Sequence, residues 1–439
     1  MSFFYFTLLP VAAAGSDLSR CSDALASNAE WFFAQSGAPT GSGISDGNEA
    51  TLAAQFKIAE RQLTNCWKTP APYWEVQLNT AGYFSRMIAT FPSGCQNCSD
   101  IFHEKVSMLP DFVRWGICAP AVCSTYQVIS EVLPRYISYI LRTDLLMPPP
   151  ASPQDVKVAE LSHWSQLRLD FIIAGVNSCG TSSLHLNLYE HEEIHFSTGR
   201  QEDPFLFKHD GVLPYKAEVE RFNFIRESKQ ASMGARGFHL WGMKHPGLFH
   251  SVRARQAMSR IQSLRVLMIV CDPLTRLDKS VLLYRYCNFN RSSSDSNKSC
   301  WPSVRYALHD SEFMMGLSVG SHLKAMLNIF GDRLRLLHQE ALRENPEAVF
   351  GEVAQFLGAQ PFPFGRTFRH YNSRCQRRTD LCSSPELVHE LRQELSSEYD
   401  ALEDVLTASG VPVPLVMKQR LGICERIETF KNDVHCIDG

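Results

Sequence analysis

Small and hydroxyl-bearing side chains follow a short apolar run before the middle of the chain. The run Phe171–Ala174 predicts a buried strand, and Gly175–Gly180 ends it. From Thr181 onward, Leu184 and Leu188 share one face of a predicted helix. The N–H groups at a helix start attract anions, and nearby hydroxyls add donors. The pattern predicts a phosphate cradle; a plain structural turn is the alternative, because the lysine of a nucleotide-binding loop is absent. The candidate contacts are Ser178, Cys179, Gly180, Thr181, Ser182 and Ser183.

A second apolar run, Leu264–Val270, predicts another buried strand. The polar segment Cys271–Ser280 follows it and contains an Asp-Pro pair near its start. Ligands of open α/β sheets bind outside the carboxyl ends of the strands. Arg276 and Ser280 are therefore candidates to bind a second phosphate. The alternative is an ordinary connection from strand to turn to helix.

The composition indicates an ordinary globular protein with more than one domain. The chain has 439 residues, of which 44% are hydrophobic and 20% charged, so disorder is excluded as the main state. The length predicts two or three domains. The formal net charge of −3 argues against a nucleic-acid-binding protein, which needs a basic excess, although a local basic face remains compatible with it.

The cysteines and the amino terminus indicate an oxidising compartment. Six of the 14 cysteines lie in the first third and eight in the rest, so both counts allow pairing into disulfides. Zinc is the alternative, but Cys95 and Cys98 form the one short pair, so no metal is expected. The apolar segment at residues 1–15 predicts a signal peptide or an uncleaved anchor, with a buried helix as the alternative. Three sequons fit a glycoprotein of the secretory pathway, in the Golgi lumen or outside the cell. Membrane association is expected only through the amino-terminal segment, since no later run is long enough to span a bilayer.

Four prolines between residues 147 and 154 predict an extended linker, placed at 146–160. Before it, residues 21–145 predict a small, disulfide-rich and mainly helical domain. Its expected helices are Cys21–Gln35, Ala50–Thr64 and Tyr126–Leu141, with Ser124 as a cap of the last one. After it, residues 161–439 carry the α/β signals described above.

Residues 21–145 resemble the amino-terminal extracellular domain of the nose-resistant-to-fluoxetine family. The segment Arg114–Ser124 carries the match, since it is similar to that family's Gly-x-Cys-x-Pro-x-x-Cys signature. Ala34–Asn48 and Asn65–Cys66 add to it. A multi-pass acyltransferase usually follows this domain in the family. No membrane spans follow here, so that activity is not carried over, and an apolar or glycan ligand would be a guess.

Residues 165–410 resemble the carbohydrate sulfotransferases of the heparan-sulfate type. The predicted phosphate cradle at residues 175–183 is similar to that family's 5′-phosphosulfate loop. The segment Cys271–Ser280 is similar to its 3′-phosphate segment. Further matches follow in order along the chain: Leu188–Phe196, Gln201–Phe207, Gly242–Pro246, Val319–Gly331, Glu340–Phe350, Phe356–Phe364 and a last helix at Glu386–Leu406. The resemblance implies an α/β fold with a parallel sheet flanked by helices. It also implies 3′-phosphoadenosine 5′-phosphosulfate (PAPS) as sulfuryl donor and a hydroxyl or amine acceptor, with a carbohydrate expected.

The resemblance also implies catalytic residues. Glu202 stands where the family keeps its base, and Lys244 occupies a family-like position. Ser178 stands where the family has a lysine, so Lys244, or less well Lys208, is the candidate replacement for that charge. In the second segment, Cys271 replaces an arginine. The serine spacing there is shifted by one residue, so Lys279 becomes a further candidate to bind the 3′-phosphate.

The segment Gly365–Cys382 is locally basic and offers Arg374, with other arginines, to a phosphate or an anionic glycan. A solvated charged loop is the alternative. Related enzymes imply a Cys375–Cys382 bridge there.

Two other functions stay open. In the first, the loss of the loop lysine leaves a catalytically impaired protein that binds nucleotide or glycan. In the second, the amino-terminal domain is the functional part and the other domain is a scaffold.

Overall fold

A computed structural model divides the chain into two compact units. The first unit comprises Met1–Leu167 and His209–Arg221, and the second comprises Arg168–Lys208 and Phe222–Gly439. The structure describes residues 15–35, 40–41, 49–68, 71–80, 82–84, 112–141, 147, 149–150, 155–202, 212–234, 239–284, 301, 303–369, 379–420 and 424. The amino-terminal segment 1–14 and the three sequons lie outside the described residues. None of the helices in the described ranges is both long and apolar enough to cross a bilayer.

An antiparallel sheet forms the centre of the first unit, with strand order β1-β3-β2-β4. β2 and β3 pair along their full length, from Tyr73 opposite Cys118 to Asn79 opposite Phe112. The sequence analysis expected a mainly helical domain and did not include this sheet. The strand bounds are Thr40–Gly41 for β1, Tyr73–Asn79 for β2, Phe112–Cys118 for β3 and Val156–Glu160 for β4.

The three predicted helices of the first unit are present beside this sheet. The last one begins after Ser124, whose hydroxyl accepts a hydrogen bond from the Gln127 N–H, while the Gln127 side chain accepts one from the Ser124 N–H. This is a capping box, so the predicted cap is confirmed. The bounds are α1 Gly15–Gln35, α2 Glu49–Trp67, and then α5 Thr125–Gln127, η1 Val128–Val132 and α6 Leu133–Leu141 in one continuous stretch. The 3-10 turn η2 covers Trp164–Gln166, and α8, Lys216–Ser232, begins in the first unit and ends in the second.

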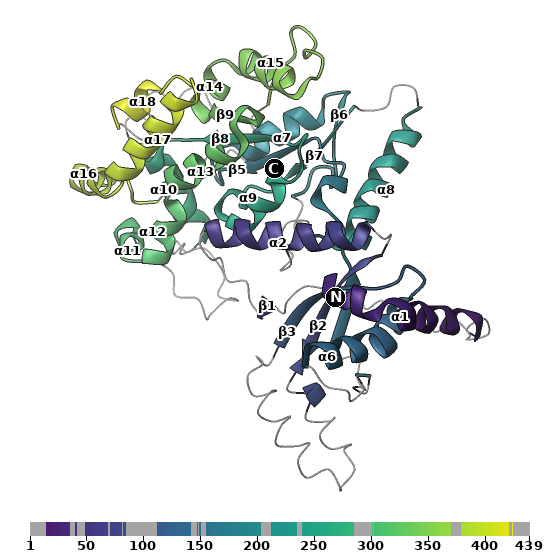
Figure 1. Ribbon diagram of the computed structural model, residues 1–439. Helices are drawn as coiled ribbons and strands as arrows, with labels where there is room; N and C mark the ends of the chain where they lie inside the picture. The colour runs from purple at the N-terminus through teal and green to yellow at the C-terminus, as the bar shows by residue number, and fades with distance from the viewer. Residues whose placement is uncertain are drawn as a thin grey trace, which may run out of the picture. The chain divides into compact units, whose positions relative to one another are not determined.

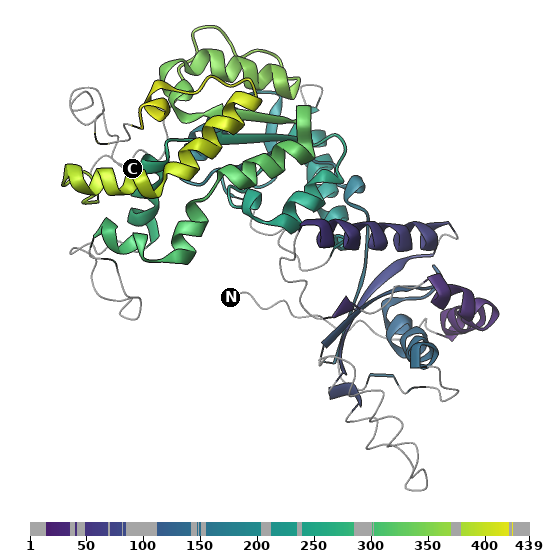
Figure 2. The same ribbon diagram turned by 60° about the vertical axis from the view of Figure 1, so that its left-hand side comes forward.

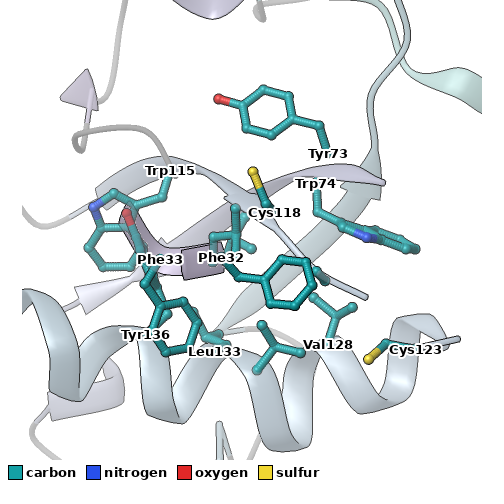
Figure 3. Packing of buried hydrophobic residues seen from close by; sticks show 14 of the residues in the cluster. Phe32, Phe33, Tyr73, Trp74, Trp115, Cys118, Cys123, Val128, Leu133 and Tyr136 are labelled. Carbon is teal, nitrogen blue, oxygen red and sulfur yellow. The ribbon is translucent and has the colours of Figure 1, made fainter. Parts of the chain in front are cut away.

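Two disulfides between described residues and an aromatic core stabilise the first unit. Cys21 is bonded to Cys123, and Cys66 to Cys118, so each bond joins a helix to the β3 region or to the turn that follows it. Figure 3 shows aromatic rings between the sheet and the last helix. The Tyr136 ring lies 5.5 Å from that of Phe33 and 6.2 Å from that of Trp115. Aromatic pairs at such spacings stabilise a core beyond the area that they bury.

A parallel sheet forms the centre of the second unit, with strand order β6-β7-β5-β8-β9. Every residue of β5 is buried, as predicted for a central strand covered on both faces. The predicted α/β fold is confirmed. The strand bounds are Phe171–Gly175 for β5, Ile194–Phe196 for β6, Leu240–Lys244 for β7, Arg265–Val270 for β8 and Leu334–His338 for β9.

Helices flank both faces of this parallel sheet (Figures 1 and 2). On one face, Phe171 and Leu267 belong to a core cluster with Leu184 and Val353, which come from helices α7 and α15. The other face is close to Phe249, because a Cβ atom on Gly175 would lie 2.5 Å from that ring. The helix bounds are α7 Thr181–Tyr189, η4 Leu248–His250, α9 Val252–Ser259, α10 Pro273–Tyr284, α11 Val304–Leu308, α12 Ser311–Leu317, α13 Gly320–Phe330, η5 Gly331–Arg333, α14 Gln339–Glu344, α15 Pro346–Leu357, α16 Pro385–Glu394, α17 Ser396–Ala408 and α18 Leu415–Lys418.

Three details differ from the sequence-based expectations. The predicted linker 146–160 overlaps strand β4, whose Val158 pairs with Val76, because an alternating apolar pattern resumes after the prolines. The expected last helix is two helices, α16 and α17, which meet at Leu395. The expected Cys375–Cys382 bridge is wrong, since Cys382 is bonded to Cys424. Spacing alone does not fix disulfide connectivity.

Candidate functional site

The loop between β5 and α7 ends in a helix start that has no side-chain cap. Gly180 is the residue that precedes α7, and its φ of +103° is a conformation that favours glycine. A Cβ atom there would also lie 3.4 Å from the Gln339 side chain. Thr181 and Ser183 are buried, whereas Ser182 is half-buried. The backbone N–H groups of this helix start and the Ser182 hydroxyl lie where the sequence predicts an anion cradle, which stays a prediction.

A disulfide joins this first loop to the second predicted segment. Cys179 is bonded to Cys271, the residue that follows β8, and both are almost fully buried. β5 and β8 are neighbours in the parallel sheet, so their carboxyl ends lie close enough for this bond. Cys179 was predicted to contact the sulfuryl donor PAPS, but its sulfur is bonded to Cys271. The bond also explains why a cysteine stands at 271, where the resemblance expects an arginine.

Lys244 brings three of the predicted residues together. It is the last residue of β7 and its side chain is only 5% exposed. Its ammonium group donates to the Ser182 hydroxyl at 3.1 Å and lies 2.9 Å from the Glu202 carboxylate. Glu202 is 55% exposed, so its carboxylate is open to solvent on one side and paired on the other. A buried cation, a helix start and an accessible carboxylate therefore meet at the carboxyl edge of the sheet.

His185 interacts electrostatically with both Lys244 and Glu202, and it was not predicted from the sequence. Its ring packs 4.2 Å from Phe196, and its Nε2 lies 2.9 Å from the Gly199 carbonyl oxygen. Burial first, and then the charge of Lys244, lowers the pKa of His185 to about 4, against the opposing effects of the Gly199 carbonyl and Glu202. The imidazole is therefore neutral at pH 7. The sequence feature that could have identified His185 is its position one helical turn after Thr181, on the same face of the helix.

Lys279 reaches the first loop from α10. Its ammonium donates to the Ser178 carbonyl oxygen at 3.1 Å and to the Gln339 side-chain oxygen at 3.4 Å. Lys279 is half-buried, and Ser178 has a φ of +68°. From the sequence, Lys279 was predicted only as a ligand of the 3′-phosphate, and no role was predicted for Gln339. The signal for Gln339 was its place directly after a strand, at the edge of the sheet where ligands bind.

Arg276 has its guanidinium directed at main-chain carbonyls. It is 6% exposed and donates to the carbonyl oxygens of Gly316, at 2.8 Å, and Leu317. Together with Cys179 and Glu398 it lines a cavity of about 10 Å³, which is room for about one water molecule and none for a phosphate. In this arrangement Arg276 is not presented to an open cleft with Thr181. Ser280 is also buried, so its hydroxyl is not presented to solvent.

The first residues of the basic segment 365–382 contact α7 and the residue that follows it. Arg366 pairs with Glu190 at 2.7 Å, and the Asn187 side chain exchanges hydrogen bonds of 2.8 and 3.0 Å with the main chain of Arg369. Arg374, Lys208 and Cys375 lie outside the described residues. Among the residues whose placement is described, no group of three His, Cys, Asp or Glu side chains is arranged to hold a metal ion.

No family model matches the chain. No curated protein matches it. Solved structures with a similar fold include a sulfotransferase from Alicyclobacillus acidocaldarius, 18% identical with a TM-score of 0.39 over 56% of this chain and 97% of that one. Mouse sulfotransferase SULT7A1 complexed with PAP is 11% identical, with a TM-score of 0.26 over 44% of this chain and 60% of that one. The sulfotransferase domain from the curacin biosynthetic pathway is 10% identical, with a TM-score of 0.31 over 58% of this chain and all of that one. At TM-scores this low, these likenesses add nothing to the geometry of the site.

Proposed function

We propose that the second unit transfers a sulfuryl group from PAPS to a hydroxyl or amine acceptor. The observation that carries this proposal is the junction of Lys244 with Ser182 and Glu202, at 3.1 and 2.9 Å. Such a transfer needs a cation for the developing negative charge, donors for a phosphate and a base for the acceptor proton. The junction supplies one group of each kind at the carboxyl edge of a parallel sheet, where α/β proteins bind ligands.

The loop before α7 suits the phosphosulfate end of such a donor. Gly180 leaves the backbone open on the side of Gln339, where a Cβ atom would lie 3.4 Å from that side chain. The helix that follows has nine residues and begins with the hydroxyls of Thr181, Ser182 and Ser183. Its N–H groups and its dipole both favour an anion at this end.

Each residue of the junction then has a part in the reaction. The acceptor oxygen or nitrogen forms a bond to sulfur while the bond from sulfur to the bridging oxygen breaks, and that electron pair leaves with 3′-phosphoadenosine 5′-phosphate. Glu202 accepts the proton that the acceptor loses, and its exposure lets an acceptor approach from solvent. Lys244 stabilises the charge that grows on the departing phosphate, in a site where burial strengthens the interaction.

The acceptor that we propose is a carbohydrate, and this part rests on the resemblance to carbohydrate sulfotransferases. The secretory pathway is the proposed compartment. Among the described residues, four disulfides link Cys21 to Cys123, Cys66 to Cys118, Cys179 to Cys271 and Cys382 to Cys424. Disulfides persist in oxidising compartments. The likeness of the first unit to the nose-resistant-to-fluoxetine domain stays a prediction.

A binding protein that has lost its catalytic charge is the less favoured function. Its basis is the neutral Ser178, but the ammonium of Lys279 lies 3.1 Å from the Ser178 carbonyl and that of Lys244 lies 3.1 Å from Ser182. Two cations therefore contact the loop and the first turn of α7, although the loop itself carries none.

The test is transfer of labelled sulfate from PAPS to a panel of glycans, with calorimetric binding of 3′-phosphoadenosine 5′-phosphate measured on the same full-length protein. We expect both nucleotide binding and transfer to at least one carbohydrate. Binding without transfer to any acceptor would favour the binding-protein alternative. Absence of both would remove the proposal.

A further inference from the structure

The first loop lacks the lysine that the resemblance implies, but a lysine from another helix contacts this loop. Ser178 is neutral, and its carbonyl oxygen accepts a hydrogen bond from Lys279 at 3.1 Å. Lys279 belongs to α10, which is about a hundred residues further along the chain. A positive charge thus reaches the loop from a different element of the fold.

The approach of Lys279 is fixed by covalent and hydrogen bonds. Cys271 precedes α10 by two residues and is bonded to Cys179, the neighbour of Ser178. From the start of α10 at Pro273, Lys279 lies ~9 Å along the helix, at 1.5 Å for each residue. The Gln339 side chain accepts a second hydrogen bond from its ammonium at 3.4 Å. The loop and the base of α10 are therefore held together, and the ammonium has a defined position between them.

The same Gln339 side chain connects Lys279 to the cradle. Its Nε2 is the atom nearest to a Cβ placed on Gly180, at 3.4 Å. Gly180 immediately precedes the N-terminal turn of α7. Lys279 is half-buried, and a lysine adjusts easily because it is a point charge on a four-carbon stem. An anion bound at the cradle would meet Lys279 on the loop side and Lys244 on the side of Ser182.

We propose that Lys279 is the cation that contacts the 5′-phosphate of the donor at the first loop, in place of a lysine at position 178. This inference rests on the proposed function, since it names a ligand of the same site. It differs from the sequence-based prediction, in which Lys279 binds the 3′-phosphate of the donor. Lys244 then stabilises the departing phosphate from the side of Ser182, and Glu202, at 2.9 Å from Lys244, faces the acceptor.

The test measures binding of 3′-phosphoadenosine 5′-phosphate and the kcat and KM for PAPS, in the full-length protein and in Lys279→Met. We expect nucleotide affinity to fall about 10- to 100-fold, which is the usual effect of losing one charge-assisted hydrogen bond. We expect kcat to fall as well, because the contact strengthens as the phosphate departs. Lys279→Arg should restore most of both. Lys324→Met, an exposed lysine on α13, is the matched control and should bind as the parent does.

A second variant distinguishes a charge from a structural hydrogen bond. Ser178→Lys should restore binding and turnover in the Lys279→Met protein and change little in the parent, because one cation already occupies the place. Nucleotide affinity unchanged in Lys279→Met would overturn the inference and leave the proposed function standing. Loss of affinity that neither Lys279→Arg nor Ser178→Lys restores would also overturn it, since the lysine would then only support the loop. Parent protein that neither binds the nucleotide nor transfers sulfate would refute both proposals.

Discussion

The ammonium of Lys244 lies 2.9 Å from the carboxylate of Glu202, and the two side chains differ sharply in exposure, at 5% and 55%. The buried member also donates to Ser182 in the first turn of α7. The pair therefore joins the anion cradle to a carboxylate that solvent can reach. In the reaction that we propose, the cation would face the departing group and the carboxylate would face the acceptor.

Replacing Lys244 by methionine should lower kcat for sulfate transfer ~10²–10³-fold, the usual loss when one preorganised donor is removed from a transition state. Methionine keeps most of the buried volume of the lysine stem, so the fold should survive. The measurement is steady-state kinetics with PAPS. The matched control is Lys216→Met, which breaks a 2.7 Å pair with Glu160 in the first unit. Equal losses in the two variants would contradict the assignment of Lys244.

Replacing Glu202 by glutamine should lower kcat ~10²–10⁴-fold with little change in nucleotide affinity, because the carboxylate serves the acceptor proton. Glutamine retains the size of the side chain and its ability to accept a hydrogen bond from Lys244. Turnover and calorimetric binding of 3′-phosphoadenosine 5′-phosphate measure the two effects separately. Glu352→Gln is a suitable control, since that exposed residue pairs with Arg335 on the surface. A Glu202→Gln protein with parental turnover would exclude Glu202 as the base.

Removing the Cys179–Cys271 bond by changing both residues to alanine should lower the free energy of unfolding by about 2–4 kcal/mol. We also expect weaker nucleotide binding, because the bond fastens the first loop to the end of β8. The control is the double alanine variant of Cys382 and Cys424, a bond that involves neither loop of the cradle. It should lose stability with unchanged affinity. If both variants bind the nucleotide equally well, the disulfide has no part in positioning the loop.

The buried His185 predicts a stability that depends on pH. Its pKa is lowered to about 4 by burial and by Lys244, whereas the unfolded chain takes up this proton near the ordinary histidine value of 6.5. Between these values the unfolded state binds more protons, so stability is full above pH 6.5 and falls by about 1.4 kcal/mol for each pH unit down to about pH 4. Chemical denaturation at several pH values measures this slope.

His185→Gln should remove this part of the slope, since glutamine can still donate to the Gly199 carbonyl but does not titrate. The control is His239→Gln, because the His239 side chain is 74% exposed. An identical slope for the parent and His185→Gln would show that the pH dependence arises elsewhere.

Local patterns in the sequence predicted the elements that surround the site. The run Phe171–Ala174, the glycine-rich break and the leucine spacing after Thr181 defined β5, the loop and α7, because burial on both faces and helical periodicity leave a direct trace in the residue pattern. The same holds for β8. Lys244 and Glu202 were identified by resemblance, and the structure places them within 2.9 Å of each other.

Only the tertiary structure decided which distant residues meet. The β2–β3 sheet of the first unit pairs Tyr73 with Cys118, and nothing local in either strand names its partner. The bond of Cys179 to Cys271 follows from the pairing of β5 with β8, and the contact of Lys279 with Ser178 follows from both. The sequence by itself therefore determined the strands, the helices and the loop between β5 and α7, because these depend on neighbours within a few residues. The contact of the Lys279 ammonium with the Ser178 carbonyl depends on packing between segments about a hundred residues apart, so only the folded chain shows it.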